Sequence, residues 1–245
     1  GAQITIDGVK EIHDARRRNI TKESTFDKLI DRANYLLNEN LSVIVRINID
    51  KENIGRVDEL LDTLAERINR RADLKIDFGQ VSSYTEICKS IENDCYNNAQ
   101  FADVMLPLYE KVLARGFNVN KMAAYPGPRV NFCCTDYVNS FVVDNHGELS
   151  RCWHHVGNLK KSAGNVSDED LTLEKNYFSW IQWNPIKHPK CRECNCLPIC
   201  MGGCPDAMRN SNDGQPVCGT VRYNLDKVLQ SYYEQLKGEA ASIED

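Results

Sequence analysis

The stretch "KCRECNCLPICMGGCPD", Lys190 to Asp206, places five cysteines within fourteen positions of a chain of 245 residues. They are Cys191, Cys194, Cys196, Cys200 and Cys204. A tetrahedral metal ion takes four ligands and a disulfide takes two, so five thiols this close exceed the need of either. The remainder of the chain must therefore show what this stretch binds and which residues complete the binding.

The cysteines are distributed unevenly along the chain. Of eleven, nine lie between Cys133 and Cys218, and only Cys88 and Cys95 precede them. No basic and then apolar signal segment opens the sequence, so we expect a cytoplasmic protein. In a reducing compartment, thiols are more often metal ligands than disulfides, and an odd total leaves one thiol unpaired in any disulfide scheme. We therefore expect a metal-binding second half.

The bulk composition argues against two classes of partner. Hydrophobic residues make up 42% of the chain and charged residues 27%, as is ordinary for a globular protein with a core. A formal net charge of -5 gives no general attraction to nucleic acid or to anionic lipid. No apolar run approaches the roughly 20 residues that a membrane span needs. We therefore expect neither nucleic acid nor a membrane among the partners.

The first half of the chain alternates between strand and helix patterns. Three runs have the composition of strands, at residues 3–6, 41–49 and 74–79. Three segments between or after them carry apolar residues at helical spacing, at residues 26–37, 57–68 and 101–112. Pro107 must either kink the last of these helices or mark a local start. Alternation of this kind predicts βα units and a parallel sheet.

These units are too few for a closed barrel. A (β/α) barrel typically has eight strands and about 250 residues, whereas roughly 120 are available here. The chain also opens at Gly1 directly into a strand. We therefore interpret residues 1–122 as the late portion of a partial barrel whose front half is missing. A small open sheet, complete in itself, is the alternative.

The periodicity changes after a connection rich in Pro and Gly at residues 123–132. The run "SFVVDNHGELSRCW" predicts a hairpin, with a strand at Ser140–Val143, a turn at Asp144–Gly147 and a return strand. Residues 159–189 show weak periodicity, and we assign them no element. A last amphipathic helix is expected over 225–236. We therefore expect a cysteine-rich domain over 123–222, followed by a terminal helix and tail over 223–245.

Cysteine spacing favours iron–sulfur clusters over a single zinc ion. Cys134 precedes Gly147 by thirteen positions, and Cys152 follows that glycine by five. The run C-x2-C-x5-C-x3-C then begins at Cys191, and Cys218 follows it. One structural zinc needs four ligands, whereas each iron–sulfur cluster takes four thiolates and favours close runs. Seven regularly spaced cysteines nearly fill two clusters, with zinc and disulfides as the alternatives.

This pattern resembles the SPASM domain, the auxiliary-cluster domain at the C-terminus of many radical S-adenosylmethionine (SAM) enzymes. The likeness runs from about Cys134 to Cys218 and includes the hairpin and "LPICMGGCP" at 197–205. "QITIDGVKEIHDARR" (3–17) and "VIVRINIDKENI" (43–54) resemble late strands of the radical SAM barrel. The resemblance implies an α/β fold, in which the late portion of a radical SAM partial (β/α) barrel precedes a small, cluster-stapled SPASM domain.

The resemblance also implies two interleaved [4Fe-4S] clusters. The first cluster would be bound by Cys134, Cys152 and Cys204. The second would be bound by Cys191, Cys194, Cys200 and Cys218. The first is one thiolate short, and Cys133, Cys95 or Cys88 would complete it, or an open iron site would bind substrate. Cys133 adjoins a ligand, and neighbouring side chains in extended backbone point to opposite faces, which weakens its case. Cys196 matches no ligand position and is expected to be a bystander thiol.

The chain departs from the family in its catalytic loop. Radical SAM enzymes bind SAM through a third [4Fe-4S] cluster, held by a CxxxCxxC loop early in the barrel, and no such early loop occurs here. We expect this chain alone not to cleave SAM, and its catalytic residues stay unassigned. Arg46 and Asn48, near the C-terminal end of the second strand, are expected to contact SAM in the full-length enzyme. Ordinary solvation of a strand end is the alternative.

By resemblance, the full-length enzyme would modify a peptide or protein. A 5'-deoxyadenosyl radical would abstract a substrate hydrogen, and the auxiliary clusters would accept an electron or anchor the substrate. The product would be a crosslink or an oxidised side chain, and an external electron donor or acceptor is required. Anaerobic sulfatase-maturating enzymes carry an aspartate after the cysteine equivalent to Cys152, whereas this chain has Trp153, which favours peptide maturases. A stand-alone iron–sulfur scaffold or electron carrier is the alternative from another class.

Other polar and aromatic residues carry weaker expectations. Asp7 either begins a turn with Gly8 or faces the strand-end cavity, and the turn is favoured slightly. His13 and Asp14 are expected at the surface or at a helix start. His154 and His155 are expected to have an outer role near a cluster or none. The tryptophans are expected to pack around the clusters and exclude water, at positions Trp153, Trp180 and Trp183.

Overall fold

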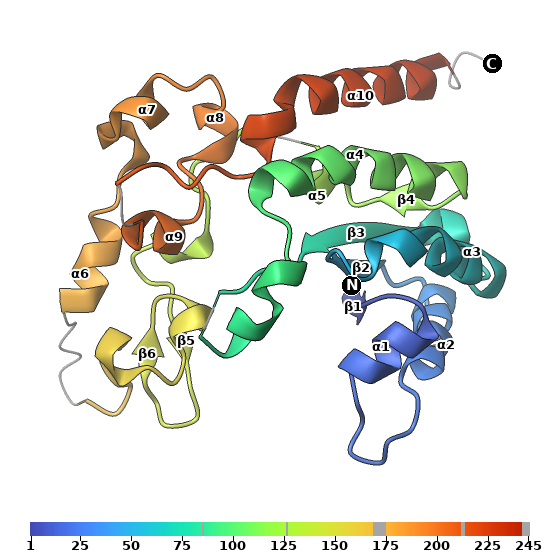
Figure 1. Cartoon of the computed structure of the whole chain (residues 1–245), viewed down its shortest axis with the longest axis horizontal. Coiled ribbons are helices and arrows are strands. Elements are labelled where there is room, and N and C mark those ends of the chain that lie inside the picture. The colour runs from blue at the N-terminus through green and yellow to red at the C-terminus, as the bar shows by residue number, and fades with distance from the viewer. Residues whose placement is uncertain (85, 126, 169–174, 212–213, 242–245) are drawn as a thin grey trace. The chain divides into compact units, whose positions relative to one another are not determined.

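The computed structural model describes residues 1–84, 86–125, 127–168, 175–211 and 214–241 (Figure 1). The chain divides into two compact units, Gly1–Pro126 with Tyr223–Asp245, and Gly127–Arg222. The last helix, which we expected as a separate segment, thus groups with the first unit. Each unit is described on its own below.

A parallel sheet forms the centre of the first unit. Its strand order is β1-β2-β3-β4. The strands are β1 (Ala2–Ile6), β2 (Val43–Ile49), β3 (Leu74–Gln80) and β4 (Asn118–Val119). All three pairings are parallel, so that Ile4 lies opposite Val45 and Val45 lies opposite Ile76. The expected α/β class with a parallel sheet is confirmed, and the two-residue strand β4 is an addition that the sequence did not reveal.

Helices follow the strands as the hydrophobic spacing predicts. The α-helices of this unit are α1 (Lys10–Arg16), α2 (Phe26–Asn38), α3 (Val57–Arg67), α4 (Asn98–Ala114), α5 (Lys121–Ala124) and α10 (Val221–Ala241). Short 3-10 helices span Ile54–Arg56, Arg71–Asp73 and Glu86–Asp94. Pro107 lies inside α4 rather than at a start. The helix begins instead with a capping box, in which Asn97 accepts from the backbone N–H of Gln100 at 2.9 Å.

The core of this unit lies where the helices meet one face of the sheet. Strand β2 buries alternate residues, while Ile44, Arg46 and Asn48 on its other face stay half-exposed. Helix α10 joins the core through Val228 and runs along α4, where the Asn224 side chain donates to the carbonyl of Ala102 at 3.0 Å (Figure 1). One face of the sheet is therefore packed, and the other carries polar side chains.

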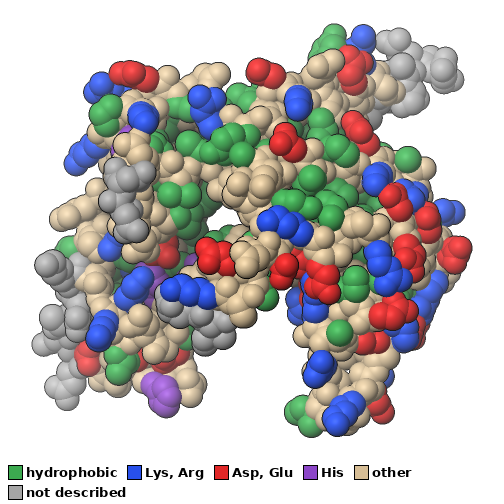
Figure 2. All heavy atoms as spheres, viewed as in Figure 1, with side chains coloured by type: hydrophobic (Ala, Val, Ile, Leu, Met, Phe, Trp, Pro, Cys, Tyr) green, Lys and Arg blue, Asp and Glu red, His purple; other side chains and the backbone are tan. Residues whose placement is uncertain are grey.

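The surface of the first unit carries interspersed charges of both signs (Figure 2). Several are paired, for example Asp27 with Arg67 at 2.5 Å and Asp62 with Arg115 at 2.6 Å. These pairs are exposed, so each contributes only about 0–1 kcal/mol to stability. Among the described residues, no helix combines the length and the apolar character that crossing a membrane requires.

The second unit contains little regular structure. The predicted hairpin is confirmed, since β5 (Val142–Val143) pairs antiparallel with β6 (Leu149–Ser150). Four short helices follow, α6 (Lys175–Ile181), α7 (Pro189–Arg192), α8 (Leu197–Cys200) and α9 (Pro205–Arg209). Single 3-10 turns occur at Cys134–Asp136, Trp153–His155, Leu159–Lys161 and Pro185–Lys187. Residues 169–174, within the segment we left unassigned, lie outside the described residues. The described part of this unit buries one small apolar cluster, Leu149, Ala163 and Tyr177.

Candidate metal centres

Five cysteine side chains line one cavity of about 560 Å³ in the second unit. They are Cys191, Cys194, Cys196, Cys200 and Cys218. Burial raises the pKa of the Cys191 thiol, and the charges of Cys218, Cys200 and Cys194 raise it further. The structure thus brings together the four cysteines that the sequence assigned to one cluster. We call this group, without Cys196, the second centre.

The fifth thiol of the cavity, Cys196, is the most deeply buried of them, with 1% of its surface exposed. Burial raises its pKa, and so does the neighbouring charge of Cys194. Its sulfur lies 3.5 Å from the Asn195 side-chain oxygen and 4.0 Å from the Val221 carbonyl, within donor range of both. Those contacts fit a thiol that donates to oxygen, which is the bystander role expected for it.

The turn between Cys200 and Cys204 depends on glycine. Met201, Gly202 and Gly203 all adopt left-handed backbone angles, with φ of 47°, 83° and 74°. A side chain at Gly202 would also overlap Pro185 Cβ. Three left-handed residues in succession reverse the chain sharply, and only glycine adopts that region without strain. This turn separates Cys200, in the second centre, from Cys204.

Cys204 belongs instead to a group with Cys152 and Cys133, which we call the first centre. Burial raises the pKa of Cys152 to about 11, and the charges of Asp206, Cys204 and Cys133 act in the same direction. The pKa of Cys204 is also raised, first by burial and then by Asp206 and Cys133. We group these three cysteines because the charges of Cys133 and Cys204 both raise the pKa of Cys152, and that of Cys133 also raises the pKa of Cys204.

Each sulfur of the first centre accepts a hydrogen bond from nearby backbone. The N–H of His154 donates to Cys152, the N–H groups of Asp206 and Ala207 donate to Cys204, and that of Asp136 donates to Cys133. Backbone N–H groups directed at sulfur stabilise the thiolate form and tune metal–sulfur centres. The backbone around each of the three cysteines therefore favours the thiolate form, which is the form that binds metal.

Cys133 and Cys134 are arranged differently. The backbone at Cys133 is extended, with φ of −135° and ψ of 155°. Cys133 acts electrostatically on Cys152 and Cys204, whereas Cys134 is exposed and acts on the guanidinium of Arg151. The resemblance to the SPASM domain implies Cys134 as the ligand, and that assignment stays a prediction. The other upstream candidates, Cys88 and Cys95, lie in the first unit, where Cys95 donates to the carbonyl of Ile91 at 3.3 Å.

Arg151, immediately before Cys152, is a buried cation with 1% of its surface exposed. Its guanidinium lies 5.2 Å from the centre of the Phe141 ring and 5.1 Å from that of Tyr177. It also donates to backbone carbonyls of the loop that follows Cys134, those of Thr135, Tyr137, Val138 and Ser140. Arg151 therefore fixes this loop against the hairpin that carries Cys152. Sequence gave no signal for it, because arginine is usually exposed.

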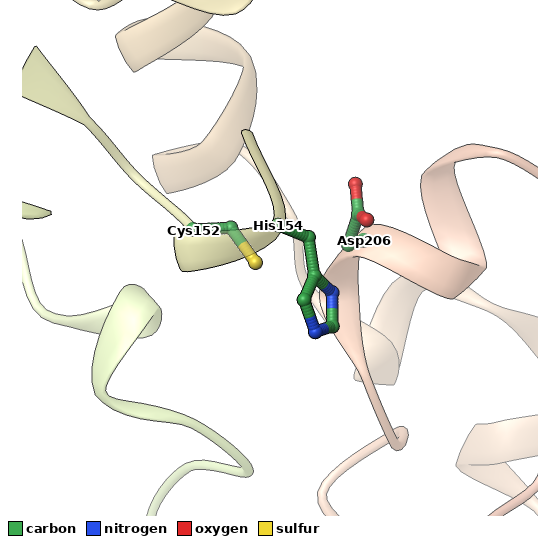
Figure 3. A group of neighbouring side chains, drawn as sticks. All are labelled: Cys152, His154 and Asp206. Carbon is green, nitrogen blue, oxygen red and sulfur yellow. The ribbon is translucent and has the colours of Figure 1, made fainter. Parts of the chain in front are cut away.

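A mixed group of ligand types lies beside Cys152 (Figure 3). One ligand atom each from Cys152, His154 and Asp206 lie within 4.8 Å of one another. The Asp206 carboxylate is held by His155 Nε2 at 2.9 Å and by the Asn210 side chain at 2.9 Å, both on Oδ1. His155 contacts the carboxylate of this group rather than belonging to the group itself, and its outer role near a cluster stays a prediction.

The tryptophans are only partly as expected. Trp180 is buried, with the His155 ring 5.6 Å away and the Arg209 guanidinium 4.6 Å from its ring centre. Trp183 is half-buried. Trp153 is 70% exposed, so the expectation that it packs around a cluster is wrong for this side chain. Its place in a one-turn 3-10 helix turns it outward, while Cys152 before it is buried.

At the sheet of the first unit, Arg46 and Asn48 form part of a polar row. Arg46 Nε donates to Asn48 Oδ1 at 3.2 Å, and Asn48 Nδ2 donates to Asp7 Oδ1 at 2.9 Å. At the other end of this row, Arg46 Nη1 lies 3.6 Å from Asp77 Oδ2. Asp7 and Asn48 line a cavity of about 420 Å³. Asp7 is therefore more than the start of a turn, because its carboxylate belongs to this row and accepts from Arg17 at 2.5 Å.

His13 is fully buried, which makes the surface expectation for it wrong. Its Nδ1 accepts the backbone N–H of Asp7 at 3.2 Å, and its Nε2 lies 3.1 Å from Thr25 Oγ1. These two partners satisfy both ring nitrogens, so the ring is buried without an unpaired nitrogen. Asp14 accepts from the backbone N–H groups of Thr25 and Phe26, at 2.9 and 3.1 Å, so it caps the start of α2 from another helix.

Comparison with known proteins adds a relation of fold. No family model matches the chain, and no curated protein matches it. It resembles native anSMEcpe with AdoMet and the Kp18Cys peptide bound, with a TM-score of 0.56 and 16% identity over 95% of this chain and 69% of that one. It also resembles Streptococcus suis SuiB bound to S-adenosylmethionine, with a TM-score of 0.54 and 17% identity over 88% of this chain and 53% of SuiB. Over most of its length, the chain therefore has the mixed α/β fold of these two proteins.

Proposed function

We propose that this chain is the iron–sulfur-binding C-terminal part of a radical SAM enzyme that modifies a peptide or protein after translation. The observation that carries the proposal is the division of seven cysteines into two groups. Four of them line one cavity as the second centre, and three others lie together as the first centre. In this proposal each centre holds one [4Fe-4S] cluster.

The donor sets fit such clusters. A four-iron cluster takes four thiolates, and the second centre offers four thiols to a single cavity. The first centre offers three sulfurs, each of which already accepts backbone N–H groups. Bound clusters would supply one-electron transfer. The residues of the chain orient the sulfurs, donate hydrogen bonds to them and, through buried Trp180, limit the access of water near Asp206 and His155.

The fold likeness supports the enzyme class. The two proteins compared above were both solved with AdoMet, and one of them also with a peptide. A peptide or protein substrate, an external electron donor or acceptor, and SAM with a third cluster in the full-length enzyme complete the proposal. Arg46 and Asn48 would then face SAM from the sheet, together with the cavity that Asn48 lines.

Anaerobic reconstitution, followed by iron and acid-labile sulfide analysis, tests the clusters. Two four-iron clusters predict about eight irons and about eight sulfides per chain. Four irons or fewer would contradict the proposal. A colourless protein that binds zinc without sulfide would support a zinc module in its place, because clustered Cys and His also bind zinc.

Two further measurements test the enzyme class. The chain alone, reduced in the presence of SAM, is expected to release no 5'-deoxyadenosine, because it lacks the CxxxCxxC loop. In the gene, a CxxxCxxC codon pattern within about 100–130 residues upstream of Gly1 is expected from the size of a barrel. An initiator Met directly before Gly1 would instead favour a stand-alone electron carrier.

A further inference from the structure

The first centre has one ligand too few for a four-iron cluster if only cysteines are counted. Cys133 has an extended backbone and Cys134 begins the 3-10 turn that follows it. Cys133 acts electrostatically on Cys152 and Cys204, whereas Cys134 is exposed, so we count one of the two thiols at this centre. With Cys152 and Cys204 this gives three thiolates. A fourth ligand from the second unit must then be of another type.

We infer that His154 is the fourth protein ligand of the first cluster, and that Asp206 orients its imidazole. The inference rests on the proposed function, since it assumes a cluster at this centre. A ring nitrogen of His154, the Cys152 sulfur and an Asp206 carboxylate oxygen lie within 4.8 Å of one another. Figure 3 shows Cys152 and the His154 ring on the same short turn, beside the helix that carries Asp206.

The position of His154 follows from the local chain. The 3-10 turn Trp153–His155 sends Trp153 to solvent and returns His154 to the side of Cys152. The backbone N–H of His154 already donates to the Cys152 sulfur. The same residue thus supports one ligand through its main chain and supplies another through its ring.

Asp206 is fixed where a ligating histidine would need a partner. His155 Nε2 and the Asn210 side chain both bond to Oδ1, and the Asp206 backbone N–H donates to Cys204. Histidine ligands commonly donate their second ring N–H to a carboxylate, which sets the tautomer and the ring orientation. Asp206 therefore lies within 4.8 Å of a His154 ring nitrogen while its backbone N–H supports Cys204.

The test detects histidine nitrogen directly. The full chain is reconstituted anaerobically, with either natural or 15N-labelled histidine, then reduced and examined by pulsed EPR. We expect a histidine nitrogen coupling on a reduced cluster, which changes on labelling and disappears in His154→Ala. His146→Ala, in the exposed hairpin turn of the same unit, is the matched control and keeps the coupling.

A second variant guards against loss of folding. His154→Cys replaces the nitrogen ligand by sulfur, so it is expected to keep about eight irons, to lose the coupling and to lower the reduction potential of that cluster, since histidine ligation raises it. Full iron and sulfide in the wild-type chain without any histidine coupling would overturn the inference and leave the proposed function intact. Failure of the wild-type chain to bind iron and sulfide would overturn both.

Discussion

The guanidinium of Arg151 donates through Nη2 to the carbonyl oxygen of Tyr137, at 2.6 Å, from a position that is almost fully buried. The same side chain donates to three further carbonyls of the loop after Cys134 and lies 5.2 Å and 5.1 Å from the centres of the Phe141 and Tyr177 rings. A buried cation is tolerated here because backbone oxygens and π faces replace its water. The hydrogen bonds from Arg151 thus satisfy carbonyls of this loop in place of regular strand or helix hydrogen bonds.

Arg151→Met is therefore expected to release the loop at residues 135–140. Each buried carbonyl left without a donor costs about 1–3 kcal/mol. In Arg151→Met we expect faster amide hydrogen exchange over 135–141 and loss of iron from the first centre. Arg151→Lys keeps the charge but not the planar guanidinium, so we expect an intermediate effect from it. Arg192→Met, an exposed arginine of the same unit, is the control. Unchanged exchange in Arg151→Met would show that the loop is held by other contacts.

Cys200 and Cys196 provide a matched pair within the same cavity. Cys200→Ala is expected to lower the iron content by about half or to unfold the second unit, because that unit has little apolar core and depends on metal. Cys196→Ala is expected to keep about eight irons, because its thiol donates toward oxygens rather than serving as a ligand. Iron analysis after reconstitution measures both. If Cys200→Ala kept its full iron content, or if only Cys196→Ala lost iron, Cys196 rather than Cys200 would be the ligand.

Sequence patterns predicted the elements whose hydrophobic spacing repeats. Helices α2, α3 and α4 and the hairpin lie where periodicity and turn residues placed them. Strand β4 has two residues, which is too short for any pattern. His13 was misplaced because a polar side chain in a helix normally faces water, and its two partners, Asp7 and Thr25, lie outside that helix.

In the candidate centres, too, sequence patterns do not reveal contacts between residues that are far apart in the chain. The resemblance to the SPASM domain groups the four cysteines of the second centre, and the fold brings these four to one cavity. Spacing alone does not determine which of Cys133 and Cys134 faces Cys152, because backbone direction sets that choice. The nearness of His154 to Asp206, more than fifty positions away, depends on how α9 is placed in the second unit. Such contacts leave no local signal.

Gly79 lets the Arg46 guanidinium cross strand β3. A Cβ at this position would lie 2.6 Å from Arg46 Nε and 2.6 Å from Asn48 Oδ1. Gly79→Ala is therefore expected to displace the ends of both flexible side chains and to lower the free energy of unfolding by about 0.5–1 kcal/mol. Gly55→Ala, with open space around the new methyl group, is the control.

A double variant localises the effect of Gly79→Ala. If the clash with Arg46 dominates, Gly79→Ala combined with Arg46→Ala is expected to lose less stability than the two single changes added together. Urea unfolding of the four chains measures this coupling. Additive losses would mean that Arg46 does not lie over Gly79 in solution.

The buried ring of His13 predicts a pH dependence of stability. Its Nδ1 accepts the backbone N–H of Asp7, so the folded protein holds the ring neutral. Burial lowers the pKa of His13, against the opposing charges of Asp7 and Asp14 and together with that of Arg17. The unfolded chain takes up a proton near the ordinary pKa of about 6.5, while the folded chain resists it. The contribution of neutral His13 to the free energy of unfolding is therefore complete above that pH. It is lost as the pH drops toward the lowered pKa of the folded protein.

Substitution of His13 by Gln removes this titration and keeps an acceptor and a donor. Between about pH 7.5 and about pH 5.5, we expect the free energy of unfolding to fall more for the wild type than for His13→Gln. The extra fall is about 1.4 kcal/mol for each unit by which folding lowers the pKa of His13. Urea unfolding at the two pH values measures the difference. His146→Gln, at the exposed hairpin turn, should retain the wild-type pH dependence. Equal slopes for wild type and His13→Gln would mean that His13 accepts a proton in the folded state, which the Asp7 hydrogen bond forbids.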